Sequence, residues 1–166
     1  RGLRRVFILD TDIVSNLRRK RPHPSLVPWI DGIGWNEIST TAFTVMEIQI
    51  GIERARRTDP SVAVAVVQWL DGLISSGQPQ VLGFDLYAAM IYGRMHETPE
   101  LRSFLAGPKS ARKAKTGADL AIAAIAITQG AVVATGNVAD FLEIHALFPL
   151  PGLYNPLTGI WHVTPG

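Results

Sequence analysis

The sequence contains no cysteine, which excludes disulfide scaffolds, thiolate zinc sites and cysteine nucleophiles. Charged residues make up only 18% of the 166 residues and apolar residues 47%, a balance that excludes a disordered polyelectrolyte. The longest apolar run, Leu120 to Ile127, is far shorter than the ~20 residues that span a bilayer. The apolar stretch from Val6 meets Asp10 too soon for a signal-peptide core. We therefore expect a cytoplasmic protein without membrane contact, folded as one domain over residues 1–166, with a core from about 6 to 156 and frayed ends.

Histidine is scarce and wrongly spaced for a metal site. The four histidines show neither the helical pair spacing nor the H-E-x-x-H pattern of zinc enzymes. A phosphate-binding loop is also excluded, because Gln78 and Pro79 follow the glycine pair at Gly72 and Gly77 where Lys and Ser/Thr are required. Any chemistry must therefore rest on other side chains.

Basic residues are not in large excess, since 16 Lys and Arg against 14 Asp and Glu give a net charge of +2. They are nevertheless clustered, in residues 1–21 and again between Lys109 and Lys115. Such clusters attract phosphates, although each one alone also fits a solvated loop.

Short β-like runs alternate with longer helical ones along the chain. The pattern predicts strands at 6–9, 38–41, 81–84 and 131–134, and helices over about 42–57, 60–75, 85–105 (bent or broken near Pro99) and 116–128. The tail after Leu150 is expected to add a short edge strand and then fray. Repeated strand–helix units predict a three-layer α/β/α fold with a short, mostly parallel central sheet.

Several carboxylates interrupt apolar surroundings. Asp10 and Asp12 follow the first strand, Asp140 follows the strand at 131–134, and Glu47 and Asp119 lie early in their predicted helices. Each has an ordinary structural explanation: Asp10 as a helix cap, Asp140 as a turn cap, and Glu47 and Asp119 as partners of helix dipoles. Ligand crevices lie beyond the carboxyl ends of parallel strands, so the acids can also converge there. If Asp10, Glu47, Asp119 and Asp140 gather there, these four carboxylates need a compensating cation, and oxygen ligands alone favour Mg²⁺ or Mn²⁺. Such a site can hydrolyse phosphodiesters.

Four motifs then resemble those of PIN-domain ribonucleases, specifically the VapC/FitB-type toxins of bacterial toxin–antitoxin pairs. The resemblance covers roughly 6–156 and rests on the segments 9–15 (LDTDIVS), 44–51 (TVMEIQIG), 117–124 (GADLAIAA) and 134–141 (ATGNVADF). It implies a PIN-like fold and a metal-binding catalytic site of Asp10, Glu47, Asp119 and Asp140. The polar residues Thr11, Asp12, Thr135 and Asn137 match positions that line such sites.

The resemblance also implies an endoribonuclease that leaves a 5′-phosphate and a 3′-hydroxyl, a homodimeric toxin, and a cognate VapB-type antitoxin that blocks the site and carries the operator-DNA contact. Lys115, Arg112 and Lys113 are candidate contacts to RNA phosphates, and Lys115 would share a helix face with Asp119 if that helix began one turn earlier. Two positions depart from the family pattern: Asp12, where Asn is frequent, and Gly136, where Arg is frequent.

Two alternatives remain open at this point. A haloacid-dehalogenase-type phosphatase would use the Asp-x-Asp of Asp10 and Asp12 as nucleophile and general acid, but would leave Glu47 and Asp119 without a role. A non-catalytic module would use the same fold only to bind RNA or a partner. The sequence does not identify the RNA, the cleavage site, the number of metal ions, the antitoxin or the dimer interface.

Overall fold

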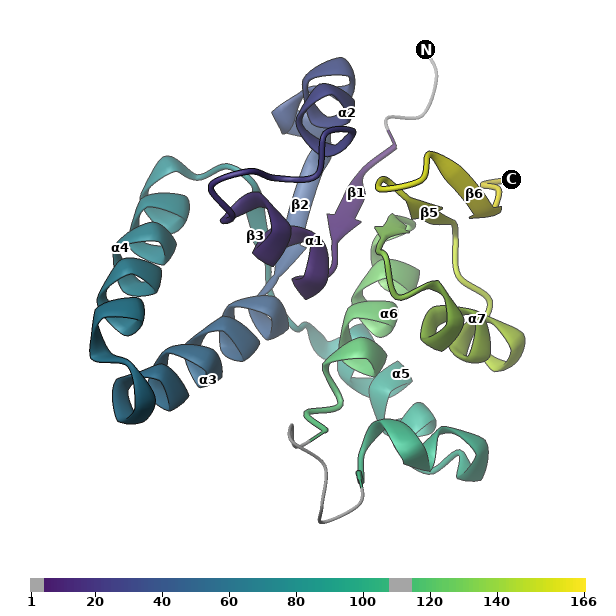
Figure 1. The fold of residues 1–166 in the computed structure, drawn as a ribbon. Coiled ribbons are helices and arrows are strands. Elements are labelled where there is room, and N and C mark those ends of the chain that lie inside the picture. Colours follow the sequence, from purple (N-terminus) through teal and green to yellow (C-terminus); the bar gives the residue numbers. More distant parts are fainter. Residues whose placement is uncertain (1–4, 108–114) are drawn as a thin grey trace.

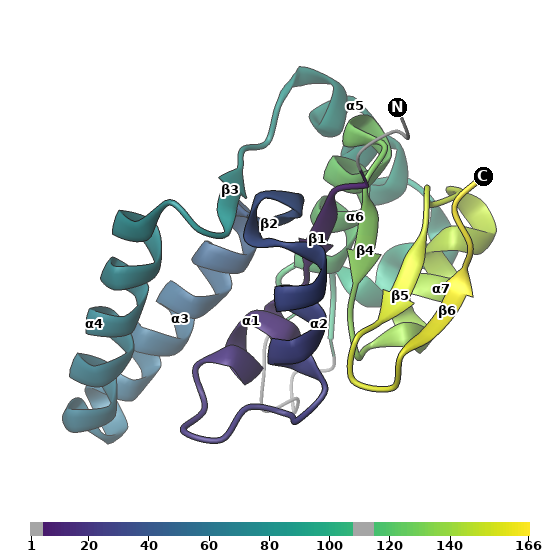
Figure 2. The ribbon, with the colours of Figure 1, turned by 90° about the horizontal axis from the view of Figure 1, so that it is seen from above.

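A six-stranded sheet lies between two groups of helices in the computed structural model, which describes residues 5–107 and 115–166 (Figures 1 and 2). The strand order is β3-β2-β1-β4-β5-β6, and every neighbouring pair is parallel except β5 and β6. The strands are β1 (Phe7–Leu9), β2 (Ile38–Thr41), β3 (Gln80–Leu82), β4 (Val132–Ala134), β5 (Leu153–Asn155) and β6 (Ile160–Val163). This arrangement confirms the predicted α/β class and its short, mostly parallel sheet.

The helices follow the predicted pattern closely where their apolar period is strong. They are α1 (Thr11–Leu17), α2 (Leu26–Ile33), α3 (Ala42–Thr58), α4 (Pro60–Ser76), α5 (Leu86–His96), α6 (Ala118–Gln129) and α7 (Val138–Leu147), with short 3₁₀ turns at Trp35–Glu37 and Pro99–Phe104. Within the described ranges, none of these helices combines the length and apolarity that a bilayer crossing requires. The pattern gave no range for α1, which was anticipated only through Asp10 as its cap, and did not reveal α2 or α7.

The core is divided by the sheet into two apolar clusters. On β1, Phe7 and Leu9 pack in the cluster with α1 to α4, whereas Ile8 points to the opposite face and packs with α5, α6 and α7. This alternation explains why β1 is a continuous apolar run, because both of its faces are covered. In Figure 2, α1 and α2 lie on one side of β1, and α6 lies on the other.

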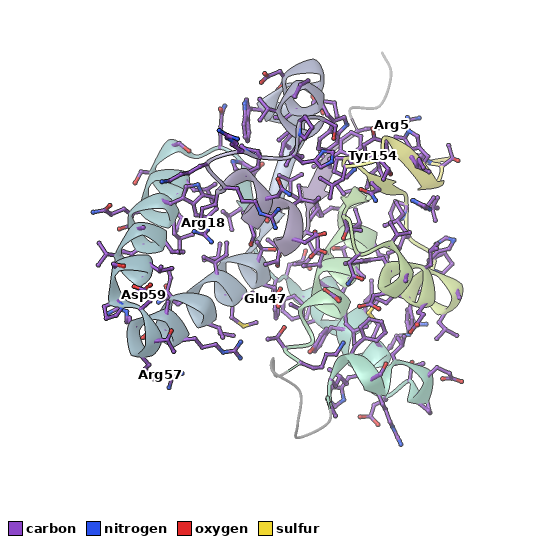
Figure 3. The ribbon with its side chains drawn as sticks, in the orientation of Figure 1. Arg5, Arg18, Glu47, Arg57, Asp59 and Tyr154 are labelled. Carbon is purple, nitrogen blue, oxygen red and sulfur yellow. The ribbon has the colours of Figure 1, made fainter. Side chains whose placement is uncertain are left out.

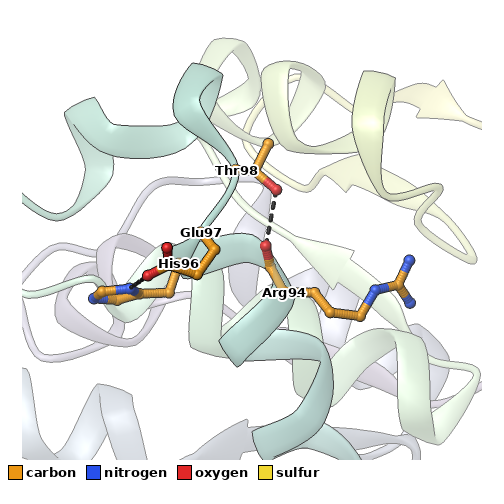
Figure 4. Close-up of polar contacts among 4 residues, drawn as sticks. All are labelled: Arg94, His96, Glu97 and Thr98. Atoms are coloured by element: carbon orange, nitrogen blue, oxygen red, sulfur yellow. Dashed lines mark hydrogen bonds and ion pairs between the residues drawn. The ribbon is translucent and has the colours of Figure 1, made fainter.

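Capping side chains fix where the helices begin and end. Asp85 caps α5 by accepting the backbone N–H of Ala88 at 2.8 Å. The same helix ends before Pro99, and the Thr98 hydroxyl donates to the carbonyl oxygen of Arg94 at 2.8 Å (Figure 4). The predicted break near Pro99 is thus confirmed, with a 3₁₀ turn after it.

The C-terminal tail adds the expected edge strand and is more ordered than predicted, because it contributes two strands. It forms β5 and β6, and β6 pairs antiparallel with β5 at the edge of the sheet. Aromatic packing explains the order: the ring of Trp161 lies 4.8 Å from that of Tyr154 and 6.0 Å from that of Phe7, measured between centroids. Burial of three rings offsets the entropy lost by ordering a short edge strand.

Replacing Trp161 with Ala should therefore destabilise the fold. Because the ring is partly rather than fully buried, we expect a loss of roughly 1–3 kcal/mol in the free energy of unfolding, measured by urea denaturation. His162 is the matched control, since its side chain lies on the exposed side of the same strand. Equal stability of the Trp161→Ala and His162→Ala variants would contradict this account of the tail.

Candidate active site

Asp10 lies where the carboxyl ends of two adjacent parallel strands meet. It follows β1, and its backbone N–H donates to the carbonyl oxygen of Ala134 in β4 at 3.0 Å. Its buried carboxyl accepts the Thr11 backbone N–H at 2.7 Å and the Thr135 hydroxyl at 2.8 Å. Asp10 therefore caps α1, as predicted from the sequence. Its carboxyl also lies at the carboxyl ends of the strands, where ligands bind in such sheets.

Glu47 is held from both sides by threonine hydroxyls. Thr11 donates to Oε1 at 2.7 Å and Thr116 donates to Oε2 at 3.0 Å. Glu47 is the sixth residue of α3, beyond the first helical turn, so a partnership with the helix dipole does not explain it. Figure 3 shows Glu47 at the end of α3 that lies nearest to α1 and α6.

Asp119 and Asp140 line the same cleft as Glu47. This cleft has a volume of about 240 Å³ and also includes Lys115 and Asn137. Asp119 is the second residue of α6, whereas Asp140 is the third residue of α7, where the Asn137 amide donates to its Oδ2 at 2.8 Å. The expectation that Asp140 caps a short turn is wrong, because α7 begins two residues before it.

Burial and neighbouring charges raise the pKa values of two acids of the site, Asp10 and Asp119. Burial raises the pKa of Asp10 well above its ordinary value, and the neighbouring charges of Asp12 and Asp119 raise it further. Burial, followed by the charges of Glu47 and Asp140, raises the pKa of Asp119 to about 6, although the positive charge of Lys115 opposes the shift. Carboxyl groups from four separate sequence motifs are therefore close enough to interact electrostatically, so their titrations are coupled.

Asp12 and Gly136, the two departures from the family pattern, contact each other. The backbone N–H of Gly136 donates to Asp12 Oδ2 at 2.8 Å. A Cβ atom on residue 136 would lie only 2.8 Å from that oxygen and 3.2 Å from Leu157 Cδ1. A side chain at position 136 would thus displace the Asp12 carboxyl, whose pKa is raised chiefly by its own burial. Asp12 fits here because residue 136 is glycine.

The basic contacts are placed differently from the sequence expectation. Helix α6 begins at Ala118 after Gly117, whose φ of +70° belongs to the left-handed region, so Lys115 does not share a helix face with Asp119. Lys115 still lines the cleft from the preceding loop, with Nζ 5.9 Å from the centroid of the Phe104 ring. Arg112 and Lys113 lie outside the described residues.

Thr116 and Thr44 are site residues that the sequence analysis missed. Thr116 hydrogen-bonds Glu47, and the Thr44 hydroxyl lies 3.1 Å from that of Thr11, which is itself bonded to Glu47. Spacing could have revealed Thr44, which precedes Glu47 by three residues on one helical face. Thr116 comes from a loop and gave no periodic signal.

The donor set suits a hard, hydrated cation. Over the ranges 5–107 and 115–166, no three acidic or histidine side chains approach closely enough to enclose one ion. Magnesium does not require that, since it keeps several waters and is usually held by one or two carboxylates. The carboxylate oxygens and the shared negative charge of Asp10, Asp119, Glu47 and Asp140 therefore fit Mg²⁺ or Mn²⁺.

Replacing Asp119 with Asn tests whether ionisation of the Asp119 carboxyl destabilises the folded protein. A raised pKa means that the folded state loses stability as pH rises from about 4 through about 6, because the folded carboxyl must then ionise at a cost. In buffer without divalent cations at pH 7.5, the free energy of unfolding of Asp119→Asn should exceed that of wild type by up to about 3 kcal/mol. This difference should disappear near pH 4, where the wild-type carboxyl is protonated. Urea denaturation at both pH values measures it.

The control is Asp71→Asn, because Asp71 is an exposed carboxylate on α4. It should change stability little at either pH. A gain for Asp119→Asn that is equal at pH 4 and pH 7.5 would show that charge repulsion is not its cause.

Comparison with known proteins points to one group of bacterial toxins. No family model matches the chain. Ribonuclease VapC14 of Mycobacterium tuberculosis is 35% identical over 65 residues, which are 39% of this chain and 63% of that protein. Toxin FitB of Neisseria gonorrhoeae is 25% identical over 158 residues, covering 95% of this chain and 99% of that protein.

Solved structures extend the similarity to almost the whole fold. The FitAcB structure from Neisseria gonorrhoeae matches with a TM-score of 0.63 and 26% identity, covering 91% of this chain and 98% of that one. DNA-bound VapBC from Salmonella typhimurium matches with a TM-score of 0.60 and 25% identity, covering 83% and 91%. In sequence and in fold, the chain is therefore similar to VapC- and FitB-type toxins.

Proposed function

We propose that this chain is a metal-dependent endoribonuclease, the toxin of a toxin–antitoxin pair. The observation that carries the proposal is the gathering of acidic side chains from four separate motifs at the carboxyl ends of the strands, where burial and the neighbouring charges raise the pKa values of Asp10 and Asp119. Relatives named as ribonucleases support the reaction class. Neither the phosphatase nor the non-catalytic alternative gains a supporting observation.

The side chains divide into direct ligands and positioning groups. Asp10 and Asp119 are proposed as direct ligands, with Glu47 and Asp140 completing the site directly or through water. A bound Mg²⁺ or Mn²⁺ would supply charge stabilisation at the scissile phosphate and lower the pKa of a water molecule. Glu47, fixed by Thr11 and Thr116, and Asp140, fixed by Asn137, would orient the attacking water.

The reaction is a hydrolysis at phosphorus. The water oxygen forms a bond to the phosphorus, the bond from phosphorus to the 3′-oxygen breaks, and the 3′-oxygen takes up a proton. The products are a 5′-phosphate and a 3′-hydroxyl. Lys115 lines the same cleft, where its charge would attract a substrate phosphate without binding the metal.

The proposed partners are a VapB-type antitoxin and a second copy of this chain. The antitoxin proposal rests on the related complexes, such as DNA-bound VapBC, and assigns any operator contact to the antitoxin. The homodimer proposal rests on an apolar patch of α5, where Leu86, Tyr87 and Met90 are 70%, 67% and 61% exposed. Large apolar side chains gathered on a surface mark an interaction site.

Purified protein should cleave RNA with Mg²⁺ or Mn²⁺ and stop when EDTA is added. Asp10→Asn and Asp119→Asn should each lower the rate by at least about 10³-fold, because each removes a charged ligand. Asp12→Asn should keep most of the activity, whereas a phosphatase that uses both acids would lose it. Gel analysis of labelled RNA measures the rate, and the cleaved ends identify the products.

Contaminating nuclease is excluded by purifying the Asp10→Asn variant in parallel. Undiminished cleavage in EDTA would overturn the metal mechanism. Wild-type rates in the Asp10→Asn variant would remove Asp10 from the site.

Charge placed on the α5 patch should separate the proposed dimer. The double variant Tyr87→Glu with Met90→Glu should have half the wild-type mass by light scattering after size-exclusion chromatography, because two buried charges per subunit would be unpaired. Val64→Glu on α4 is the control, since Val64 is 57% exposed outside the patch. A monomeric wild-type protein, or a dimeric double variant, would reject this interface.

A further inference from the structure

A second pocket adjoins the acidic cleft. It has a volume of about 330 Å³, lies between α1, α3 and α4, and shares Glu47 and Thr116 with that cleft. Its size is within the range of pockets that hold small ligands. We call it the basic pocket, because Arg18 and Arg54 line it.

Two helices connect the basic pocket to the acids by the same spacing. Thr11 begins α1 and Arg18 directly follows its last residue, seven positions later; on α3 the lining residues Glu47 and Arg54 are also seven apart. Seven residues make two helical turns, or roughly 10 Å along the axis. Since Thr11 hydrogen-bonds Glu47 at 2.7 Å, a row of side chains on each helix leads from this bond to one of the two arginines. Figure 3 shows Arg18 in the space between α1 and α4.

Neither arginine is neutralised by another residue of the described ranges. Among residues 5–107 and 115–166, the guanidinium groups of Arg18 and Arg54 have no ion pair or hydrogen bond, whereas Arg56 on α3 pairs with Glu53 at 3.5 Å. Two guanidinium groups that line one pocket without such a partner have the charge and the donors to bind an anion such as phosphate.

The remaining walls suit a planar ring. Trp69 and Val66 line the pocket from α4, and Ile48 lines it from α3. Between Glu47 and Arg54 the row on α3 holds only Gly51, where an added Cβ would meet no atom within 4 Å. The pocket is therefore open above Gly51 and apolar beside Trp69, an aromatic surface on which a nucleobase can stack.

We propose that the basic pocket binds a nucleotide of single-stranded RNA that flanks the scissile phosphate. Arg18 and Arg54 bind its phosphate, and Trp69 packs against its base. The inference rests on the proposed ribonuclease function and adds to it a subsite that sets affinity for the strand. Because aromatic stacking accepts any base, the subsite favours unpaired RNA over a particular sequence.

Charge continuity favours RNA over an acidic peptide as the occupant. The acidic cleft repels phosphate unless a cation is bound there. The next phosphate along the RNA strand would lie near the same acids, so a positive charge close to it would strengthen its binding most. The basic pocket supplies this charge next to Glu47. A peptide would use the arginines but would gain nothing from the neighbouring acids.

Binding is tested in the Asp10→Asn background, which prevents cleavage. A short fluorescent single-stranded RNA of mixed sequence should bind about 5- to 10-fold more weakly after Arg18→Ala or Arg54→Ala. The salt dependence of log Kd should become shallower by about 0.7 for each phosphate that the variant no longer binds. Arg57→Ala is the matched control, because Arg57 is an exposed arginine of the same helix that does not line the pocket. Affinity and salt slope equal to the control would overturn the proposal.

A steric variant tests the pocket without removing charge. Gly51→Leu adds a side chain into open space on a helix and should not destabilise the fold, since leucine favours helix more than glycine. It should nevertheless weaken RNA binding about tenfold or more. Trp69→Phe should keep much of the affinity and Trp69→Leu should lose it. Unchanged binding in Gly51→Leu would show that RNA does not enter the pocket.

Cleavage kinetics separate failure of the subsite from failure of the proposed function. With Asp10 restored, Arg18→Ala and Arg54→Ala should raise KM and leave kcat within about twofold, since the arginines bind a flanking nucleotide. Absence of any RNA cleavage by the wild-type protein would refute the ribonuclease function. Normal cleavage with unchanged KM in both variants would refute the subsite alone. If the variants instead weakened binding of an acidic peptide and left RNA binding unchanged, the pocket would be a peptide site and the proposal would be wrong.

Discussion

Repulsion among carboxylates in a partly buried cleft is the constraint on which the site depends. Asp10 is buried at the end of β1, and the charges of Asp12 and Asp119 raise its pKa. Such a cluster costs stability in the absence of a cation and gains it when a cation binds. Threonine hydroxyls hold the carboxylates in place: Thr135 bonds Asp10, and Thr11 bonds Glu47. The fold thus keeps the acids together despite their repulsion.

Much of the fold could be predicted because its signals are local. The apolar run at Phe7–Leu9, the proline at the start of α4 and the left-handed Gly130 after α6 each determine an element within a few residues. The gathering of the acids could also be predicted, since Asp10 follows β1 and Asp140 follows the neighbouring strand β4. Parallel pairing brings those ends together.

The remainder depends on contacts between distant residues. The ordered tail requires Trp161 to pack on Phe7, and no period in residues 150–166 indicates that contact. Thr116 reaches Glu47 from a loop, 69 positions away in the sequence. The fit of Asp12 against Gly136 also joins two motifs, so its steric basis is visible only in three dimensions. The basic pocket is of the same kind, because three helices form it.

The most direct test of this account is a carbon NMR titration of the Asp119 carboxyl, with and without saturating Mg²⁺. We expect the pKa of Asp119 to be about 6 without the cation. When Mg²⁺ is bound the pKa should fall below its ordinary value, because the cation stabilises the ionised form. A pKa near 4 that does not respond to Mg²⁺ would contradict both the mutual repulsion of the acids and their role as a cation site.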